Sequence, residues 1–156
     1  MKVPTVDAHP LLLADRAALV GGLVWLERRW FEICGRWATD ESDPAARVLF
    51  ATHSRHHGER SGWLADRLPR AVGFDAEALS AAPDPDARSA VASAQSLTAT
   101  AERLAALAVA VADLIDRVEG AAARCRPHSD GELVRTLGLI SVDLDGHRAE
   151  IDASRG

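Results

Sequence analysis

The chain has 156 residues, of which 47% are hydrophobic and 26% are charged, and its formal net charge is −5. This size and composition are typical of a globular protein that buries its own core, so we expect one domain over residues 1–156. No segment is long and apolar enough to span a membrane, residues 1–10 lack the apolar core of an export signal, and the acidic balance argues against a nucleic-acid partner. Cys34 and Cys125 fit no metal-binding or redox spacing. We therefore expect a cytoplasmic protein without membrane or nucleic-acid partners.

Helical periodicity interrupted by proline predicts four helices. Aspartate followed by proline, at Asp43-Pro44 and again at Asp84-Pro85, is typical of a helix start and opens the second and third helices. Ser129 begins a capping-box spacing that opens the fourth helix. The predicted helices cover about residues 10–38, 44–68, 85–124 and 129–153.

The lengths of the connections predict how these helices pair. Short connections after the first and third helices favour two antiparallel hairpins. The connection between the hairpins, residues 69–84, is longer, and at ~3.3 Å per extended residue its 16 residues reach ~50 Å. It can cross the length of a bundle or fold as a compact loop. Because no strand alternation is present, we predict an all-α fold, a four-helix bundle.

One carboxylate and one imidazole are predicted to meet in the core. On a helical wheel at about 100° per residue, Glu27 lies at the centre of the apolar stripe of the first helix and His56 at the centre of the second. Both lie about 16–18 Å from the turn between the helices, so an antiparallel hairpin brings them face to face. Burying a carboxylate alone costs several kcal/mol. A Glu27–His56 pair is therefore predicted, either as a structural ion pair or as part of a functional site.

Further polar residues share the second helix with His56. The apolar residues Ala45, Leu49 and Trp63 set the orientation of this helix on the wheel. In that orientation His57 points away from the inward face, toward the surface or a seam between helices. Burying many polar side chains adds little stability compared with apolar packing, which favours a functional reason for them. The residues predicted on the inward face are His53, His56, Glu59, Arg60 and Trp63.

The fourth helix contributes a second central imidazole. His147 is centred in its apolar stripe, Asp143 lies one turn earlier, and Glu150 lies at the edge. The third helix has an apolar inward face, so the polar side chains are predicted to come from three helices and to lie against an apolar wall. The sequence leaves open whether packing brings His147 to the Glu27–His56 pair.

This arrangement resembles the ferritin-like superfamily, whose di-iron members carry Glu on each of two helices and Glu-x-x-His on the other two. Glu27 matches the Glu of the first helix, and His53-Ser-Arg-His56 falls where the first Glu-x-x-His stands, with His in the place of Glu. In Leu144-Asp-Gly-His147, Leu replaces the second Glu. The stretch 53–69 also resembles small actinobacterial ferritin-like proteins of unassigned role. The resemblance implies a ferritin-like bundle, and the changed ligands argue against a di-iron centre.

We expect a small-molecule enzyme, for example one that tailors a natural product, with Glu27, His56 and His147 as catalytic residues. Without a metal, His56 acts as general acid or base and Glu27 orients its imidazole. With a metal, Glu27, His53, His56 and His147 supply ligands to a single Fe, Mn or Zn ion, a set that suits non-haem iron. The residues expected to contact the substrate are His53, Glu59, Arg60, Asp143 and Trp63.

A non-catalytic protein is the alternative interpretation. In it, a ferritin-like scaffold that has lost its di-iron site binds a ligand or a partner protein. Trp25, Trp30 and Trp37 are then expected to lie exposed on the first helix and to form the seam of a homodimer.

Overall fold

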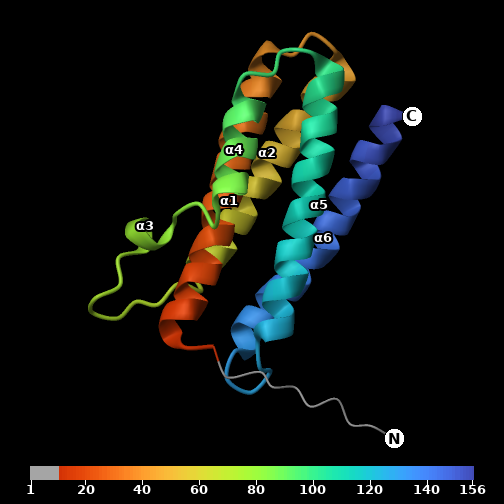
Figure 1. Cartoon of the computed structure of the whole chain (residues 1–156). Helices are drawn as coiled ribbons and strands as arrows, with labels where there is room; N and C mark the ends of the chain where they lie inside the picture. Colours follow the sequence, from red (N-terminus) through yellow and green to blue (C-terminus); the bar gives the residue numbers. More distant parts are fainter. Residues whose placement is uncertain (1–10) are drawn as a thin grey trace, which may run out of the picture.

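The computed structural model describes residues 11–156, which form six α-helices (Figure 1). These are α1 (Leu13–Asp40), α2 (Pro44–Ala65), α3 (Ala76–Leu79), α4 (Pro85–Gln95), α5 (Thr100–Arg124) and α6 (Gly131–Arg155). The described residues contain no strand, which confirms the predicted all-α class. Pro10, at which the first helix is predicted to begin, lies outside them. None of the helices within 11–156 combines the length and the apolar character needed to cross a membrane.

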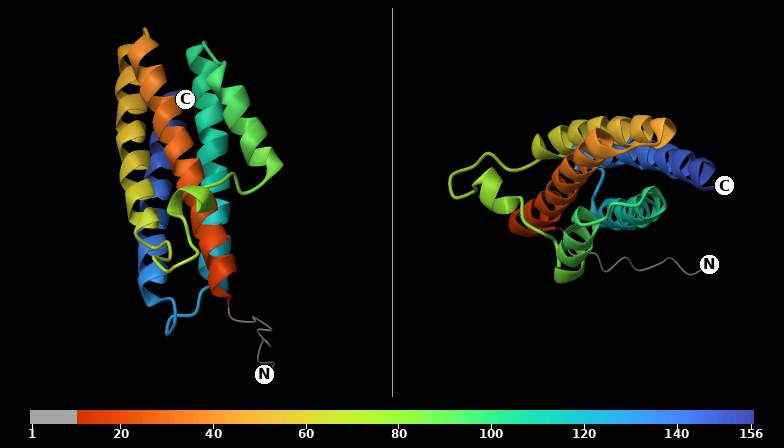
Figure 2. Two further views of the ribbon diagram at one scale, coloured as in Figure 1. Left: turned by 90° about the vertical axis from the view of Figure 1, so that its left-hand side faces the viewer. Right: turned by 90° about the horizontal axis from the view of Figure 1, so that it is seen from above.

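The four longest helices of the described chain pair in sequence order. α1 and α2 pack closely as one antiparallel pair, and α5 and α6 form another (Figure 1). The pairs meet where α1 contacts α5 and where α2 contacts α6. Seen from above, α2 and α6 lie side by side along one edge of the molecule, and α4 lies on the other side, beside α1 (Figure 2). This places the candidate site, described below, at the α2–α6 edge.

The predicted third helix, residues 85–124, is in fact two helices. The chain reverses over residues 96–99, so α4 and α5 run antiparallel to each other (Figure 1). Arg103, which is 3% exposed, holds this reversal by donating from Nε to the carbonyl oxygen of Leu97 at 3.1 Å. Its Nη1 also lies 3.3 Å from a carboxylate oxygen of the buried Glu41, in the turn between α1 and α2. The contact of Arg103 with the turn between α1 and α2 therefore stabilises the break between α4 and α5. Helical periodicity gives no information about such a contact.

The connection from α2 to α4 is an open loop that carries α3 and stands out from the long helices (Figure 1). α2 ends at Ala65 rather than at the predicted Leu68, and a one-turn helix that was not predicted, α3, packs against α1. The packing is close at Gly21, where an added Cβ would lie 2.0 Å from the carbonyl oxygen of Leu79. The short helix α4 then carries the chain back along the molecule to the start of α5 (Figure 1). The connection therefore matches neither predicted alternative fully, since it carries α3 and α4 completes the passage to the start of α5.

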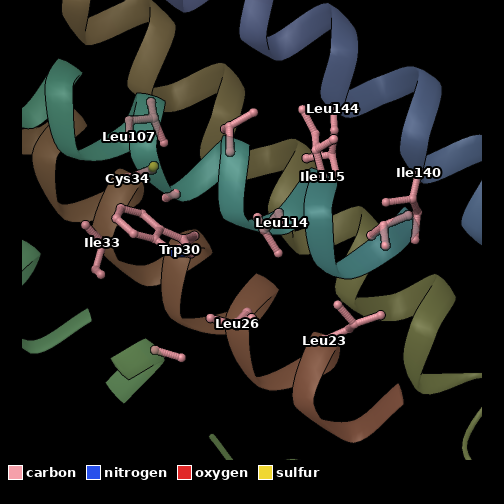
Figure 3. Packing of buried hydrophobic residues seen from close by; sticks show 14 of the residues in the cluster. Leu23, Leu26, Trp30, Ile33, Cys34, Leu107, Leu114, Ile115, Ile140 and Leu144 are labelled. Carbon is pink, nitrogen blue, oxygen red and sulfur yellow. The ribbon is translucent and has the colours of Figure 1, made fainter. Parts of the chain in front are cut away.

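Apolar side chains of α1, α5 and α6 gather in a common core (Figure 3). Trp30 and Trp37 belong to this core, with 3% and 1% of their surface exposed, and their rings pack edge to face with centroids 6.1 Å apart. Trp25 is half-buried. Packing of tryptophans in the core, the default expectation from the sequence, is therefore confirmed for Trp30 and Trp37, and the exposed seam of the non-catalytic alternative is wrong for these two residues. The labelled core residues in Figure 3 are Leu23, Leu26, Trp30, Ile33, Cys34, Leu107, Leu114, Ile115, Ile140 and Leu144.

Candidate functional site

A carboxylate lies at the centre of the buried face of α1, as predicted, because Glu27 is only 1% exposed. Its imidazole partner on α2 is His57 and not the predicted His56, since His57 Nδ1 lies 2.5 Å from Glu27 Oε2. The fully buried Arg60 donates from Nε to Glu27 Oε1 at 2.8 Å and from Nη2 to Oε2 at 3.3 Å. Glu27, His57 and Arg60 thus form a network of buried groups between α1 and α2.

The buried stripe of α2 lies one residue away from the predicted stripe. Trp63 is 41% exposed, and Ala45 and Glu59 are exposed as well. The predicted placement of Glu59 and Trp63 on the inward face of the helix is therefore wrong. Polar side chains occupy the middle of the face that is buried in the structure. The few apolar residues of the helix therefore place the predicted buried face about 100° away from the observed one. The buried residues of α2 are Ala46, Phe50, His53, Ser54, His57, Arg60 and Leu64.

α6 brings His147 to the site, a point that the sequence left open. His147 is 2% exposed, and its Nε2 lies 2.6 Å from Nδ1 of the half-buried His56. On the outer side, Nη2 of Arg55 lies 3.0 Å from His56 Nε2. Because a guanidinium can only donate, His56 accepts at Nε2 and carries its proton on Nδ1. His56 therefore donates a hydrogen bond to His147.

Two carboxylates flank the histidines. Nε2 of the fully buried His53 lies 3.3 Å from Oε2 of Glu150, and its ring centroid is 4.0 Å from that of His147. Asp143 accepts a hydrogen bond from Arg60 Nη1 at 2.8 Å, and the same Nη1 lies 3.4 Å from His147 Nδ1. Arg60 thus connects α1, α2 and α6. Each of its three nitrogens donates to a carboxylate of the described chain, which does not favour its predicted role in binding a substrate.

Burial keeps the inner histidines neutral. Burial, followed by the neighbouring imidazoles and Arg60, lowers the pKa of His53 to about 3 and that of His147 to about 2. Burial also lowers the pKa of His57, against the opposing effect of Glu27. Burial alone would raise the pKa of Glu27, but His57 and Arg60 outweigh it and hold this pKa below its usual range. At pH 7 the site therefore combines neutral imidazoles with ionised carboxylates.

Neutral imidazoles and carboxylates are ligands that divalent transition metals accept. Within the described residues, two groups offer three ligand atoms that all lie within 4.8 Å of one another. Both groups share His147 and combine two histidines with one carboxylate. Glu27, a predicted metal ligand, belongs to neither group, because His57 and Arg60 occupy its oxygens. The groups are His53, His147 and Glu150, and His56, Asp143 and His147.

The sequence interpretation missed two members of the site. His57, expected at the surface or a seam, has no exposed surface, and its spacing of four residues from His53 was the available signal, since residues i and i+4 share a helix face. Glu150, placed at the edge of its helix, has a side chain that is 54% exposed but still reaches His53. All these side chains come from α1, α2 and α6, as predicted.

Comparison with protein-family models, with curated proteins and with solved structures gives no match to this chain. The resemblance to ferritin-like proteins therefore stays a prediction. A function for the chain has to follow from the chemistry of its own side chains.

Proposed function

We propose that the protein is a metal-dependent enzyme for a small molecule, with one divalent ion bound by His53, His147 and Glu150. The observation that carries the proposal is the approach of three ligand atoms to within 4.8 Å, two of them on buried imidazoles with lowered pKa values. Two histidines and one carboxylate on one side of an ion leave other positions open, the plan that suits non-haem Fe(II). Mn(II) and Zn(II) are the alternative ions.

The position of the cluster in the fold supports a reaction site. Glu150 is exposed and both His56 and Asp143 are half-buried, so a molecule approaching the α2–α6 edge reaches the ligands from solvent. We propose that the two antiparallel pairs form a ferritin-like bundle that holds one ion where di-iron relatives hold two.

The residues around the proposed ion have separate roles. The ion supplies Lewis acidity or, if it is iron, redox chemistry. Without the ion, His56 donates from Nδ1 to His147 and accepts from Arg55 at Nε2. A neutral His147 has a single lone pair, so an ion bound by His147 would replace this hydrogen bond and leave His56 as the group positioned to move a proton between the site and solvent. Asp143 neutralises Arg60, and Arg60 in turn holds Glu27. These contacts fix the position of α6 relative to α1 and α2.

A second candidate function needs no metal. The 2.6 Å contact between His56 Nδ1 and His147 Nε2 favours general acid–base chemistry by a pair of coupled imidazoles. In that case His147 accepts the proton of His56, and a substrate contacts His56 from the solvent side.

Metal content of the purified full chain tests the first proposal. After separate loading with Fe(II), Mn(II) and Zn(II) and removal of free metal, we expect about one equivalent of at least one ion, and its loss in His147→Ala. His128→Ala, which removes an exposed imidazole, is the matched control and keeps the ion. Absence of binding for all three ions would refute the metal proposal, and two equivalents would refute a mononuclear site.

Turnover tests the enzymatic part of the proposal. The loaded protein is incubated in air with a mixture of small molecules, and consumption of each compound is followed by mass spectrometry. We expect loss of a compound that depends on both the ion and His56. Tight binding of a compound that is never consumed would instead support the non-catalytic ligand-binding alternative.

A further inference from the structure

His57 is a buried imidazole that the proposed ligand set does not use. It lies four residues after His53 on α2 and has no exposed surface. Its Nδ1 contacts Glu27 and Arg60, at 2.5 and 2.9 Å. Its other ring nitrogen, Nε2, is buried and finds no hydrogen-bond partner anywhere in residues 11–156.

The protonation state of this ring follows from its neighbours. The carboxylate of Glu27 is ionised and can only accept, so a bare Nδ1 at 2.5 Å would bring two lone pairs together. Arg60 Nη2 can only donate, but Glu27 Oε2 also accepts from it at 3.3 Å, so Nη2 does not need Nδ1 as an acceptor. The proton of His57 is therefore on Nδ1 and is donated to Glu27. A second proton on Nε2 would leave a buried N–H without an acceptor, because this nitrogen has no hydrogen-bond partner in the described residues. Nε2 is consequently a bare lone pair in the core.

A buried lone pair without a donor destabilises the fold by about 1–3 kcal/mol. Nδ1 of His53 is also buried and has no hydrogen-bond partner in the part of the chain described. Two such nitrogens one turn apart on the same face of α2 are the arrangement by which a helix presents a pair of histidines to one ion. An imidazole whose other N–H is fixed by a carboxylate is typical of a metal ligand, because the contact sets both the tautomer and the orientation of the ring.

We infer that His57 Nε2 is a further ligand of the ion in the proposed centre, and that Glu27 and Arg60 are positioning residues that hold His57 for this role. The inference rests on the proposed function. The ring centroid of His57 lies 6.2 Å from that of His147 and 6.4 Å from that of His53. With metal–nitrogen bonds of about 2.1 Å, two imidazoles on one ion have centroids about 5 Å apart. His57 belongs to neither group of ligand atoms within 4.8 Å in the described residues, so its ring has to move toward the ion before Nε2 can bind it.

X-ray absorption spectroscopy of the zinc-loaded wild-type protein counts the histidines directly, without any substitution. Scattering from the imidazole rings is expected to fit three histidines and one oxygen ligand. A fit with two histidines would overturn the inference. It would leave the metal proposal intact, with a water molecule as the partner of His57 Nε2.

Substitution provides a second measurement, made on cobalt-loaded protein. Cobalt affinity is expected to fall at least tenfold in His57→Ala, with a changed visible absorption band, because the coordination of the ion changes. Glu27→Gln is expected to shift the same band without abolishing binding, since the amide oxygen still accepts from Nδ1. Exogenous imidazole is expected to restore the band in His57→Gly, a rescue that a purely structural residue would not show. His128→Ala is the control.

The outcomes separate the two proposals. If the wild-type protein binds no cobalt, zinc or iron, the proposed function fails and the inference fails with it. If the wild-type protein and His57→Ala bind cobalt with equal affinity and equal spectra while His53→Ala does not bind, only the role of His57 is refuted.

Discussion

Substitution of Glu27 by glutamine tests whether the network of Glu27, His57 and Arg60 stabilises the fold. Glu27 is 1% exposed and accepts from Arg60 Nε at 2.8 Å and from His57 Nδ1 at 2.5 Å. Glutamine keeps one oxygen as an acceptor but removes the negative charge. Its NH2 group then faces an N–H donor of Arg60 or His57. The guanidinium of Arg60 then has only Asp143, whose side chain is 35% exposed, to neutralise it.

Removal of one partner from a buried ion pair destabilises a protein by about 3–5 kcal/mol. Because Asp143 still neutralises part of the charge on Arg60, we expect Glu27→Gln to lose about 3 kcal/mol. For a chain of this size such a loss lowers Tm by roughly 6–12 °C. The assay is urea unfolding at pH 7, followed by far-ultraviolet circular dichroism and tryptophan fluorescence.

Glu32→Gln is the matched control, because Glu32 is an exposed carboxylate on the same helix that pairs with Arg29 at 2.8 Å. Exposed pairs contribute about 0–1 kcal/mol, so the control should unfold close to the wild type. The pKa of Glu27 is lowered in the fold, so its contribution is complete above the carboxyl pKa of the unfolded chain and disappears as the pH falls through the folded value. The difference between wild type and Glu27→Gln should therefore narrow in acid. A loss below 1 kcal/mol at pH 7 would refute the reasoning.

Three further predictions concern pH, a glycine and a helix cap. The fold lowers the pKa of His53 to about 3 and that of His147 to about 2. Below about pH 6.5, both histidines therefore bind protons in the unfolded chain but stay neutral in the folded chain. Stability should therefore fall from pH 6.5 toward pH 3, by about 1.4 kcal/mol per pH unit for each proton, as measured by urea unfolding at several pH values. Gly21→Ala should lower Tm despite the better helix propensity of alanine, because its Cβ would lie 2.0 Å from the carbonyl oxygen of Leu79. Asp43→Ala should cost about 1 kcal/mol in urea unfolding, since Asp43 caps α2 by accepting from two amides, at 2.8 and 3.3 Å.

Each of these predictions has a contradicting result. Constant stability between pH 7 and pH 5 would mean that the two histidines are not neutral and buried in solution. Gly138→Ala on α6 meets nothing within 4 Å, so it should stabilise by up to about 1 kcal/mol, and an equal gain in Gly21→Ala would show that the approach of α3 to α1 is not maintained. Unchanged stability in Asp43→Ala would show that other groups satisfy the first amides of α2.

Local features of the sequence were sufficient to predict several helix starts and four of the buried polar residues, which are Glu27, His53, Arg60 and His147. Asp43-Pro44 and Asp84-Pro85 are each followed by a helix, because an aspartate that bonds to the free amides and a proline that needs no donor both act within one turn. Glu27 and His147 are buried as predicted, because clear apolar stripes on α1 and α6 set the phase of each wheel.

The tertiary structure decided the phase of α2, the break between α4 and α5, and the membership of the site. The core-facing stripe of α2 contains two histidines and an arginine, so its apolar residues misplace His57, and only contact with Glu27 shows which way the helix faces. Likewise, Arg103 holds the reversal at 96–99 through Glu41, a residue 62 positions away. Helical periodicity depends on neighbours within about two turns. Ion pairs between helices depend on which helices pack together. That arrangement exists only once the whole chain has folded, so a local sequence pattern does not predict it.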